Sequence, residues 1–138
     1  MRFLLDTDVV SEIRRGREPS VAAWVASVDA DDLYLSVLTL GEIRSGIERL
    51  RPRDPDQAVV FDVWLGELLD RFAERVLPVC RRVADQWGHL NAARPRKTVD
   101  SLIAATAHEY SLSVVTGNIR DFAGCDVPLL DPWRFGKP

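Results

Sequence analysis

Phe3-Leu4-Leu5-Asp6-Thr7-Asp8 is the stretch that decides the fold, because a continuous apolar run ends abruptly in acidic residues. A short run of this kind is typical of a central parallel strand, which is buried on both faces. Similar runs follow at 33–37 and 113–116, separated by segments with helical periodicity. The alternation predicts βαβ units, and therefore an α/β fold with a central, mostly parallel sheet and helices on both faces.

The remaining elements follow from periodicity and capping residues. Helices are expected over 9–13, from Pro19, from a cap at Thr39 to about 50, over 56–75 and 81–91, and from a cap at Thr98 to 110. Short strands are expected at 77–79 and 127–130, with a turn at 117–122. Pro78 places the 77–79 strand at an edge of the sheet, because proline cannot donate to a strand ladder.

Length and composition suit one ordinary domain. The 138 residues are 46% hydrophobic with a net charge of −3, and no linker or repeat interrupts them, so residues 1–138 are expected to form a single domain. No apolar run approaches the roughly 18 residues of a membrane span, so we expect a cytoplasmic protein with no membrane partner. The two cysteines lie far apart and indicate small buried side chains rather than a disulfide framework.

Acidic residues follow several of the predicted strands. Asp6 and Asp8 come directly after the first strand, and Glu42 lies in the helix after the second. Asp100 lies in the first turn of a later helix, and Asp121 follows the 113–116 strand. Because sites in open parallel sheets form beyond the carboxyl ends of the strands, these acids are expected to converge.

Glu42 illustrates how a helix can contribute to such a site. It lies about 120° from the centre of the apolar stripe of its helix, at the border of the packed face. Each acid taken alone could be a helix cap or a solvated position, and only their joint placement indicates a site. Carboxylates within ~4–6 Å repel one another, and Mg²⁺ or Mn²⁺ relieves the repulsion with oxygen ligands. The chemistry that such a cluster supports is attack of water on a phosphoester.

Four stretches, in order and spacing, resemble PIN-domain ribonucleases, specifically the VapC-type toxins of bacterial toxin–antitoxin pairs. They are Phe3-Leu4-Leu5-Asp6-Thr7-Asp8-Val9-Val10-Ser11-Glu12, Leu40-Gly41-Glu42-Ile43-Arg44-Ser45-Gly46-Ile47, Asp100-Ser101-Leu102-Ile103-Ala104-Ala105-Thr106-Ala107 and Thr116-Gly117-Asn118-Ile119-Arg120-Asp121-Phe122. The ending Leu130-Asp131-Pro132-Trp133 is similar too. The resemblance covers nearly the whole chain and implies a three-layer PIN-like domain.

The resemblance also implies a Mg²⁺- or Mn²⁺-dependent endoribonuclease that cuts a structured RNA of the tRNA or rRNA class. Asp6 and Asp100 would be the principal metal ligands, and Glu42 and Asp121 would complete the acidic pocket. The residues that would orient this pocket are Thr7, Thr116 and Asn118. The family further implies a homodimer and an antitoxin whose C-terminal segment enters the active-site groove. One departure is Asp8, where the family usually has Asn, which leaves the role of that position open.

A basic loop precedes Asp100. Arg94, Arg96 and Lys97 are expected to hold an RNA backbone, and a second basic patch is Arg14-Arg15-Gly16-Arg17. A merely solvated loop is the alternative interpretation.

Two other functions remain open on the sequence alone. Asp6 and Asp8 after an apolar strand also fit haloacid-dehalogenase-type phosphatases, with Asp6 as nucleophile and Asp8 as general acid. The second alternative is a non-catalytic, doubly wound binding domain with an incidental acidic edge. Asp8→Asn discriminates the enzymes, because it would abolish a phosphatase and leave a PIN nuclease largely active.

Overall fold

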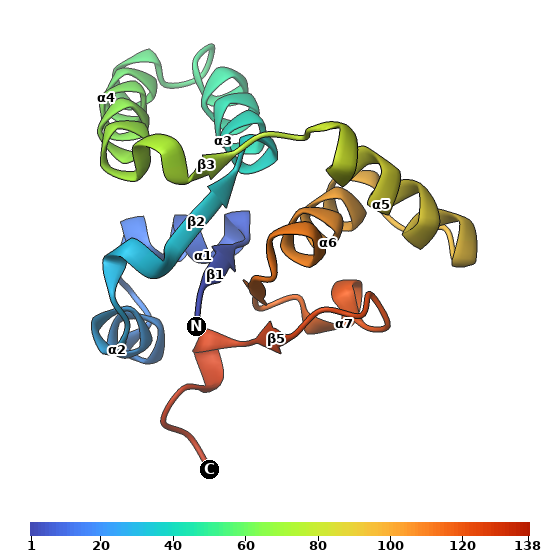
Figure 1. The fold of residues 1–138 in the computed structure, drawn as a ribbon. Coiled ribbons are helices and arrows are strands. Elements are labelled where there is room, and N and C mark those ends of the chain that lie inside the picture. The colour runs from blue at the N-terminus through green and yellow to red at the C-terminus, as the bar shows by residue number, and fades with distance from the viewer.

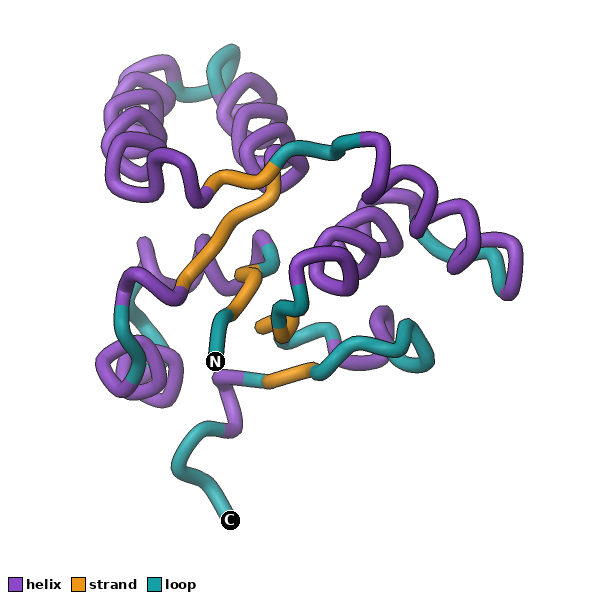
Figure 2. Tube along the Cα trace, in the orientation of Figure 1, coloured by secondary structure: helices purple, strands orange, loops and turns teal.

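A five-stranded parallel sheet forms the centre of the computed structural model, which describes residues 1–138. Its strands are β1 (Phe3–Leu5), β2 (Leu33–Ser36), β3 (Val76–Leu77), β4 (Ser113–Val115) and β5 (Leu129–Leu130). They lie in the order β3-β2-β1-β4-β5, and every neighbouring pair is parallel. Figure 2 shows these short strands in the middle of the molecule with helices around them. The most central strand is therefore β1, which comes from the stretch Phe3-Leu4-Leu5.

The helices form two layers, one on each face of the sheet. The helices are α1 (Thr7–Arg15), α2 (Pro19–Ser27), α3 (Val37–Leu50), α4 (Pro55–Phe72), α5 (Arg81–Ala93), α6 (Thr98–Tyr110) and α7 (Ile119–Phe122). Three short 3₁₀ turns cover Ala30–Asp32, Ala73–Arg75 and Pro132–Arg134. One apolar core contains residues of α1 to α4, and a second contains residues of α5 to α7. In Figure 1 α3 and α4 lie side by side, as do α5 and α6.

Alternation along β1 explains the two cores. Phe3 and Leu5 pack in the core with α1 to α4, whereas Leu4, between them, packs in the core with α5 to α7. Successive side chains of a strand point to opposite faces, so a strand between two helical layers must be apolar at every position. The predicted three-layer α/β architecture is confirmed.

The start of α3 differs from the expectation. The helix is capped by Ser36, whose Oγ accepts the Leu38 N–H at 3.0 Å, and not by Thr39. Ser36 ends β2 and is itself a favoured N-cap residue, so the helix begins three residues earlier than predicted. Thr39 is fully buried inside the helix.

Other helix and strand boundaries also differ from the predicted ones. Thr98 is the first residue of α6 rather than its cap, a position that Lys97 occupies without a side-chain bond. The helix predicted to reach Arg75 ends at Phe72, where Ala73 takes a positive φ of 48° and a 3₁₀ turn begins. The expected turn at 117–122 contains the short helix α7. The predicted edge position of the strand near Pro78 is confirmed, although β3 covers only Val76–Leu77.

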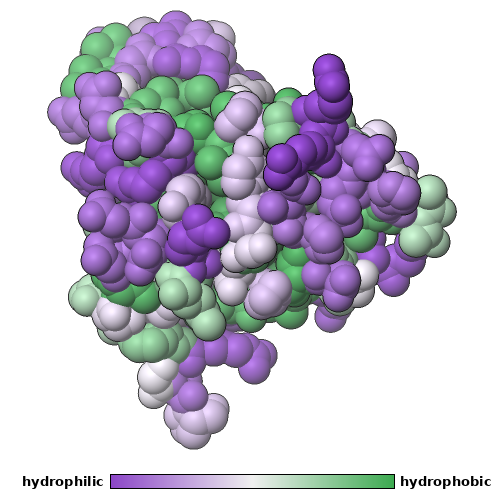
Figure 3. Space-filling view, in the orientation of Figure 1, coloured by the Kyte–Doolittle hydropathy of each residue, from purple (hydrophilic) through white to green (hydrophobic).

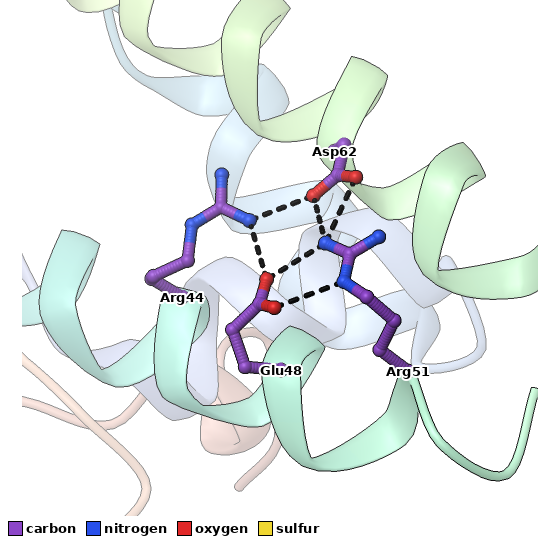
Figure 4. A network of polar contacts seen from close by, with 4 residues as sticks. All are labelled: Arg44, Glu48, Arg51 and Asp62. Carbon is purple, nitrogen blue, oxygen red and sulfur yellow. Dashed lines mark hydrogen bonds and ion pairs between the residues drawn. The ribbon is translucent and has the colours of Figure 1, made fainter. Parts of the chain in front are cut away.

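A network of ion pairs connects α3 with α4. Arg44 and Arg51 both bind Asp62 of α4, at 2.7 and 2.9 Å, and both bind Glu48 of α3 (Figure 4). Every carboxylate in this network has two arginine partners. The network therefore links α3 to α4.

The surface is mostly polar. Figure 3 shows hydrophilic residues over much of one face, with hydrophobic ones among them near α4. The exposed large apolar side chains of α4 are Val59, Val60 and Val63. None of the helices combines the length and the apolar character that a membrane crossing requires. Both cysteines are free, and Cys125 is buried as expected, whereas Cys80 is only partly buried.

Candidate active site

The strand order places a crevice between β1 and β4. After β1 the chain continues to β2 on one side, and it later returns to add β4 and β5 on the other side. Ligands of open α/β sheets bind at such a switch point, outside the carboxyl ends of the strands. Leu5 and Val115 are register partners, so the residues that follow them, Asp6 and Thr116, emerge together.

Asp6 is held firmly at this point. Its side chain caps α1 by accepting the Thr7 N–H at 2.8 Å, and its other oxygen accepts the Thr116 hydroxyl at 2.8 Å. Its backbone N–H donates to Val115 of β4 at 2.9 Å. Burial raises the pKa of Asp6, the two hydrogen bonds oppose the rise, and the charges of Glu42 and Asp121 add to it. A buried carboxylate with nearby like charges favours a cation.

Asp100 reaches the same region from the first turn of α6. Burial and then the charges of Asp6 and Asp121 raise the pKa of Asp100 to about 6, against the opposing effect of Lys97. Lys97 Nζ lies 3.5 Å from Asp121, whose side chain is one-third exposed. The structure thus brings Asp6, Asp100 and Asp121 close enough for their charges to interact.

Glu42 completes the acidic group from α3. It accepts a hydrogen bond from the Thr7 hydroxyl, and it contributes to the raised pKa of both Asp6 and Asp100. The Thr7 hydroxyl also lies 3.4 Å from that of buried Thr39. Thr7, the first residue of α1, therefore holds the Glu42 carboxylate of α3 by a hydrogen bond.

Thr116 and Asn118 connect the loop after β4 to Asp6. Thr116 is completely buried, and its hydroxyl donates to Asp6 while accepting the Asn118 N–H at 2.9 Å. The Asn118 backbone, not its side chain, makes this contact. The loop that carries Asp121 is consequently fixed to the Asp6 carboxylate by two consecutive hydrogen bonds.

Asp8 has a structural partner that the sequence did not reveal. Its Oδ2 accepts the Gly117 N–H at 2.9 Å, while its Oδ1 is buried without a partner. Burial and the charge of Asp6 raise the pKa of Asp8 to about 6. Gly117 must be glycine, because a Cβ there would lie 2.9 Å from the Trp133 ring and 3.0 Å from Asp8. Asp8 thus secures the loop after β4.

The three residues of the predicted basic loop differ in whether their side chains are held inside the protein. Arg96 donates to the Ala123 carbonyl at 2.7 Å and holds the loop after α7, which is an internal contact. Lys97 faces Asp121, and Arg94 is exposed at the end of α5. In the second patch, Arg14 stacks 4.3 Å over the Phe61 ring.

Sequence reasoning also missed a cavity beside Asp121. It has a volume of about 700 Å³ and lies between residues 117–121 and the turn Pro132–Arg134. Arg120 and Arg134 line it, and neither was singled out. The sequence did offer a signal for these two arginines. Arg120 precedes Asp121 and Arg134 follows Trp133, and both neighbours belong to stretches that resemble the PIN-domain family.

The donor set of the acidic group fits a hard divalent cation. All the converging donors are carboxylate oxygens, which Mg²⁺ and Mn²⁺ prefer. The side chains do not form a closed cage, because no three acidic, histidine or cysteine residues converge tightly enough to ligate one ion. Mg²⁺ usually keeps several waters and binds one or two carboxylates, so an open pair such as Asp6 and Asp100 suits it.

The sequence and the fold of this chain are similar to those of known proteins. The family model described as PIN domain matches residues 3–126. Toxin FitB of Neisseria gonorrhoeae is 33% identical over 138 residues, covering 96% of this chain and 99% of that protein. VapC ribonuclease Y4jK of Sinorhizobium fredii is 29% identical, covering 96% and 98%. The structure of FitAB bound to IR36 DNA fragment superimposes with a TM-score of 0.85 at 32% identity, covering 95% of each chain. With this match over most of its length, the chain belongs to the PIN-domain family, among the VapC-type toxin ribonucleases.

Proposed function

We propose that residues 1–138 form one catalytic unit, a divalent-metal-dependent endoribonuclease that acts as the toxin of a toxin–antitoxin pair. The observation that supports it most is the convergence of Asp6, Glu42, Asp100 and Asp121, because burial together with the neighbouring acidic charges raises the pKa of Asp6 and Asp100. Membership of the PIN-domain family and the ribonuclease relatives support the same reaction.

Asp6 and Asp100 would hold the metal, with Glu42 and Asp121 completing the pocket. The bound ion would supply a polarised water and a positive charge against the phosphate of the RNA. Asp6 is suited to a ligand role because Thr7 and Thr116 fix both of its oxygens. Glu42 is exposed on α3, and we propose that it accepts a proton from the attacking water.

We propose a folded RNA of the tRNA or rRNA class as the substrate. The chain carries a net charge of −3, so generic attraction to RNA is weak and affinity must come from local contacts. Arg94 and Lys97 remain our candidates for contacts to the backbone of this RNA. Arg96 supports them from within the loop, since its guanidinium is engaged by Ala123.

The protein partner that we propose is an antitoxin whose C-terminal segment enters the active-site groove, on a homodimer of this chain. Toxin FitB, a relative over nearly the whole chain, supports a protein partner, because its name is that of a toxin and the similar solved structure is of a FitAB complex. The acidic group predicts that a basic side chain of the antitoxin enters the pocket, since a cation is what the pocket lacks.

Neither alternative function gains support. The phosphatase hypothesis needs Asp8 free to act as an acid, whereas Asp8 binds the Gly117 N–H and holds the loop after β4. The family of the chain is that of PIN domains. A passive binding domain does not account for four acids placed at the switch point of the sheet.

A cleavage assay tests the proposal. Purified wild-type protein with Mn²⁺ and a folded RNA should give discrete fragments, and Asp6→Asn and Asp100→Asn should each reduce the rate at least about 100-fold. Asp70→Asn is the matched control, because Asp70 is exposed on α4 and its side chain has no partner. Equal fragment yields from wild type and Asp100→Asn would refute the nuclease function.

A further inference from the structure

The cavity beside Asp121 is lined mostly by charged and polar residues. Its volume of about 700 Å³ lies within the range of sites that hold small molecules. Arg120 and Arg134 line it together with Asp121 and Asp131, and one of the seven lining residues is hydrophobic. Such a lining suits a charged, hydrated ligand.

The guanidinium groups of Arg120 and Arg134 make no close hydrogen bond or ion pair within the protein. Arg120 makes no side-chain hydrogen bond or ion pair, and Arg134 lies only loosely, at 3.7 Å through Nε, from Asp131. By contrast Arg51 and Arg75 are fully engaged, with four and three hydrogen bonds to other residues. Free guanidinium groups bind phosphate through two parallel N–H bonds.

The charge of the cavity also favours an anion. Asp121 is paired with Lys97, and Asp131 accepts the Trp133 N–H at 3.0 Å while its second oxygen faces Arg134. The two arginines of the lining therefore balance its two carboxylates, and Lys97, beside the lining, adds one further positive charge. Because both carboxylates already have partners, an incoming anion meets the guanidinium groups of Arg120 and Arg134.

The cavity is attached rigidly to the acidic group. Its Asn118 wall is bonded to Thr116, and Thr116 is bonded to Asp6. Its Gly117 packs against Trp133, which precedes Arg134, so the loop and the C-terminal turn cannot separate without losing this contact. A ligand in the cavity is thus held at a fixed offset from Asp6.

We infer that Arg120 and Arg134 form a phosphate-binding subsite that holds the RNA nucleotide next to the one whose bond is cut. This inference rests on the proposed function, because it assigns a place on the substrate of that same site. The subsite differs from the predicted basic loop in being built from α7 and the C-terminal turn. It sets the direction in which the RNA strand leaves the acidic pocket.

A binding experiment tests the inference separately from cleavage. RNA affinity is measured by fluorescence anisotropy with a short single-stranded oligoribonucleotide in Mg²⁺, in an Asp100→Asn background so that the probe stays intact. Arg120→Gln and Arg134→Gln should each raise Kd about 3- to 10-fold, and each lost phosphate contact should reduce the salt slope by about 0.7. Arg53→Gln is the matched control, because Arg53 is an exposed arginine without a side-chain partner in the turn between α3 and α4, at the opposite end of Figure 1.

A second arm locates the phosphate. Single uncharged methylphosphonate linkages are placed one by one along the oligonucleotide. One position should cost about 3- to 10-fold in affinity, and that cost should disappear in the Arg120→Gln/Arg134→Gln double variant.

The outcomes separate the two proposals. If Arg53→Gln weakens binding as much as the cavity variants do, or if no linkage shows the coupled loss, the subsite is refuted. The same holds if the protein binds no RNA. If wild type cleaves no RNA but the coupled loss is present, Arg120 and Arg134 still bind an RNA phosphate, whereas the nuclease function and the position of that phosphate next to a cleaved bond are refuted. Unchanged thermal melting of the variants shows that they fold.

Discussion

Glu48 and Asp62, the acids between α3 and α4, each bind arginines, whereas the acids of the pocket at the carboxyl ends of the strands lie near one another. Hydrogen bonds from Arg51 and Arg44 lower the pKa of Glu48 to about 2, and the same partners lower the pKa of Asp62. At the acidic pocket the shift is opposite, because burial and neighbouring acids raise the pKa of Asp8 and Asp100 to about 6.

The difference separates a structural cluster from the candidate functional one. In the α3–α4 network every charge is compensated inside the chain, so nothing further needs to bind. In the acidic pocket Lys97 lowers the pKa of Asp100 less than burial and the neighbouring acids raise it, and the main causes of the raised pKa of Asp6 include no cation. Uncompensated carboxylates held by folding are a site for an external cation, and strongly perturbed pKa values in a crevice mark functional groups.

The largest expected contrast lies within α3 itself, which carries one acid of each cluster. Glu42→Gln should reduce RNA cleavage about 100-fold, because it removes a carboxylate from the pocket. Glu48→Gln, the same change six residues later, should leave cleavage unchanged and lower the melting temperature slightly. Steady-state cleavage rates and thermal melts check both. Similar activities for the two variants would erase the distinction between the clusters.

Metal binding should stabilise the protein through the acidic pocket only. At a Mg²⁺ concentration 100 times Kd, the free energy of unfolding should rise by about 2.7 kcal/mol. Asp100→Asn should lose most of this increment, whereas Asp62→Asn should retain it in full. Urea unfolding with Mg²⁺ and with EDTA measures the increment. A gain that persists in Asp100→Asn would place the ion elsewhere.

The two clusters should respond to pH in opposite directions. The folded-state pKa of Asp8 and Asp100 lies near 6, above the unfolded value of 3.8, so their contribution to stability is present below about pH 4 and is lost as the pH rises through 6. The folded-state pKa of Glu48 is near 2, below 4.5, so its contribution is present above pH 4.5 and lost as the pH falls toward 2.

Melting temperatures in EDTA between pH 2 and 7 test this prediction. Asp8→Asn/Asp100→Asn should flatten the fall between pH 4 and 6, and Glu48→Gln should flatten only the acid limb. A wild-type melting temperature that rises steadily from pH 4 to 7, with the double variant showing the same rise, contradicts the raised pKa values.

The smallest effect is expected for Asp8→Asn. Its amide oxygen can still accept the Gly117 N–H, so RNA cleavage should change less than about threefold. In metal-free buffer the variant should melt slightly higher than wild type, because a buried negative charge and its repulsion with Asp6 disappear. Loss of cleavage with intact folding would make Asp8 a functional acid rather than a support for the loop.

Much of the fold could be predicted because it depends on local patterns. The apolar run at Phe3-Leu4-Leu5, with turns and helical stripes between similar runs, implies a buried parallel sheet wherever those runs pair. Capping was less predictable: Thr39 and Ser36 are both suitable caps, and which one serves depends on where β2 stops pairing. Ser36 is paired with Leu77 of β3, a partner 41 residues away.

The acidic residues of the site could be found from the sequence because strand ends are local signals, and their joint spacing resembles one family. Which of these charges have partners inside the chain could not be predicted. That Arg96 holds Ala123, that Asp8 binds Gly117 and that Arg120 stays free depend on loops separated by up to 109 residues. The amino-acid sequence by itself determined the layers of the fold and the acids at its edge, through apolar periodicity and turn chemistry. Only the tertiary structure decided which charges are neutralised by neighbours and which remain open to a ligand, because Coulomb energy and burial depend on distances that chain order does not contain.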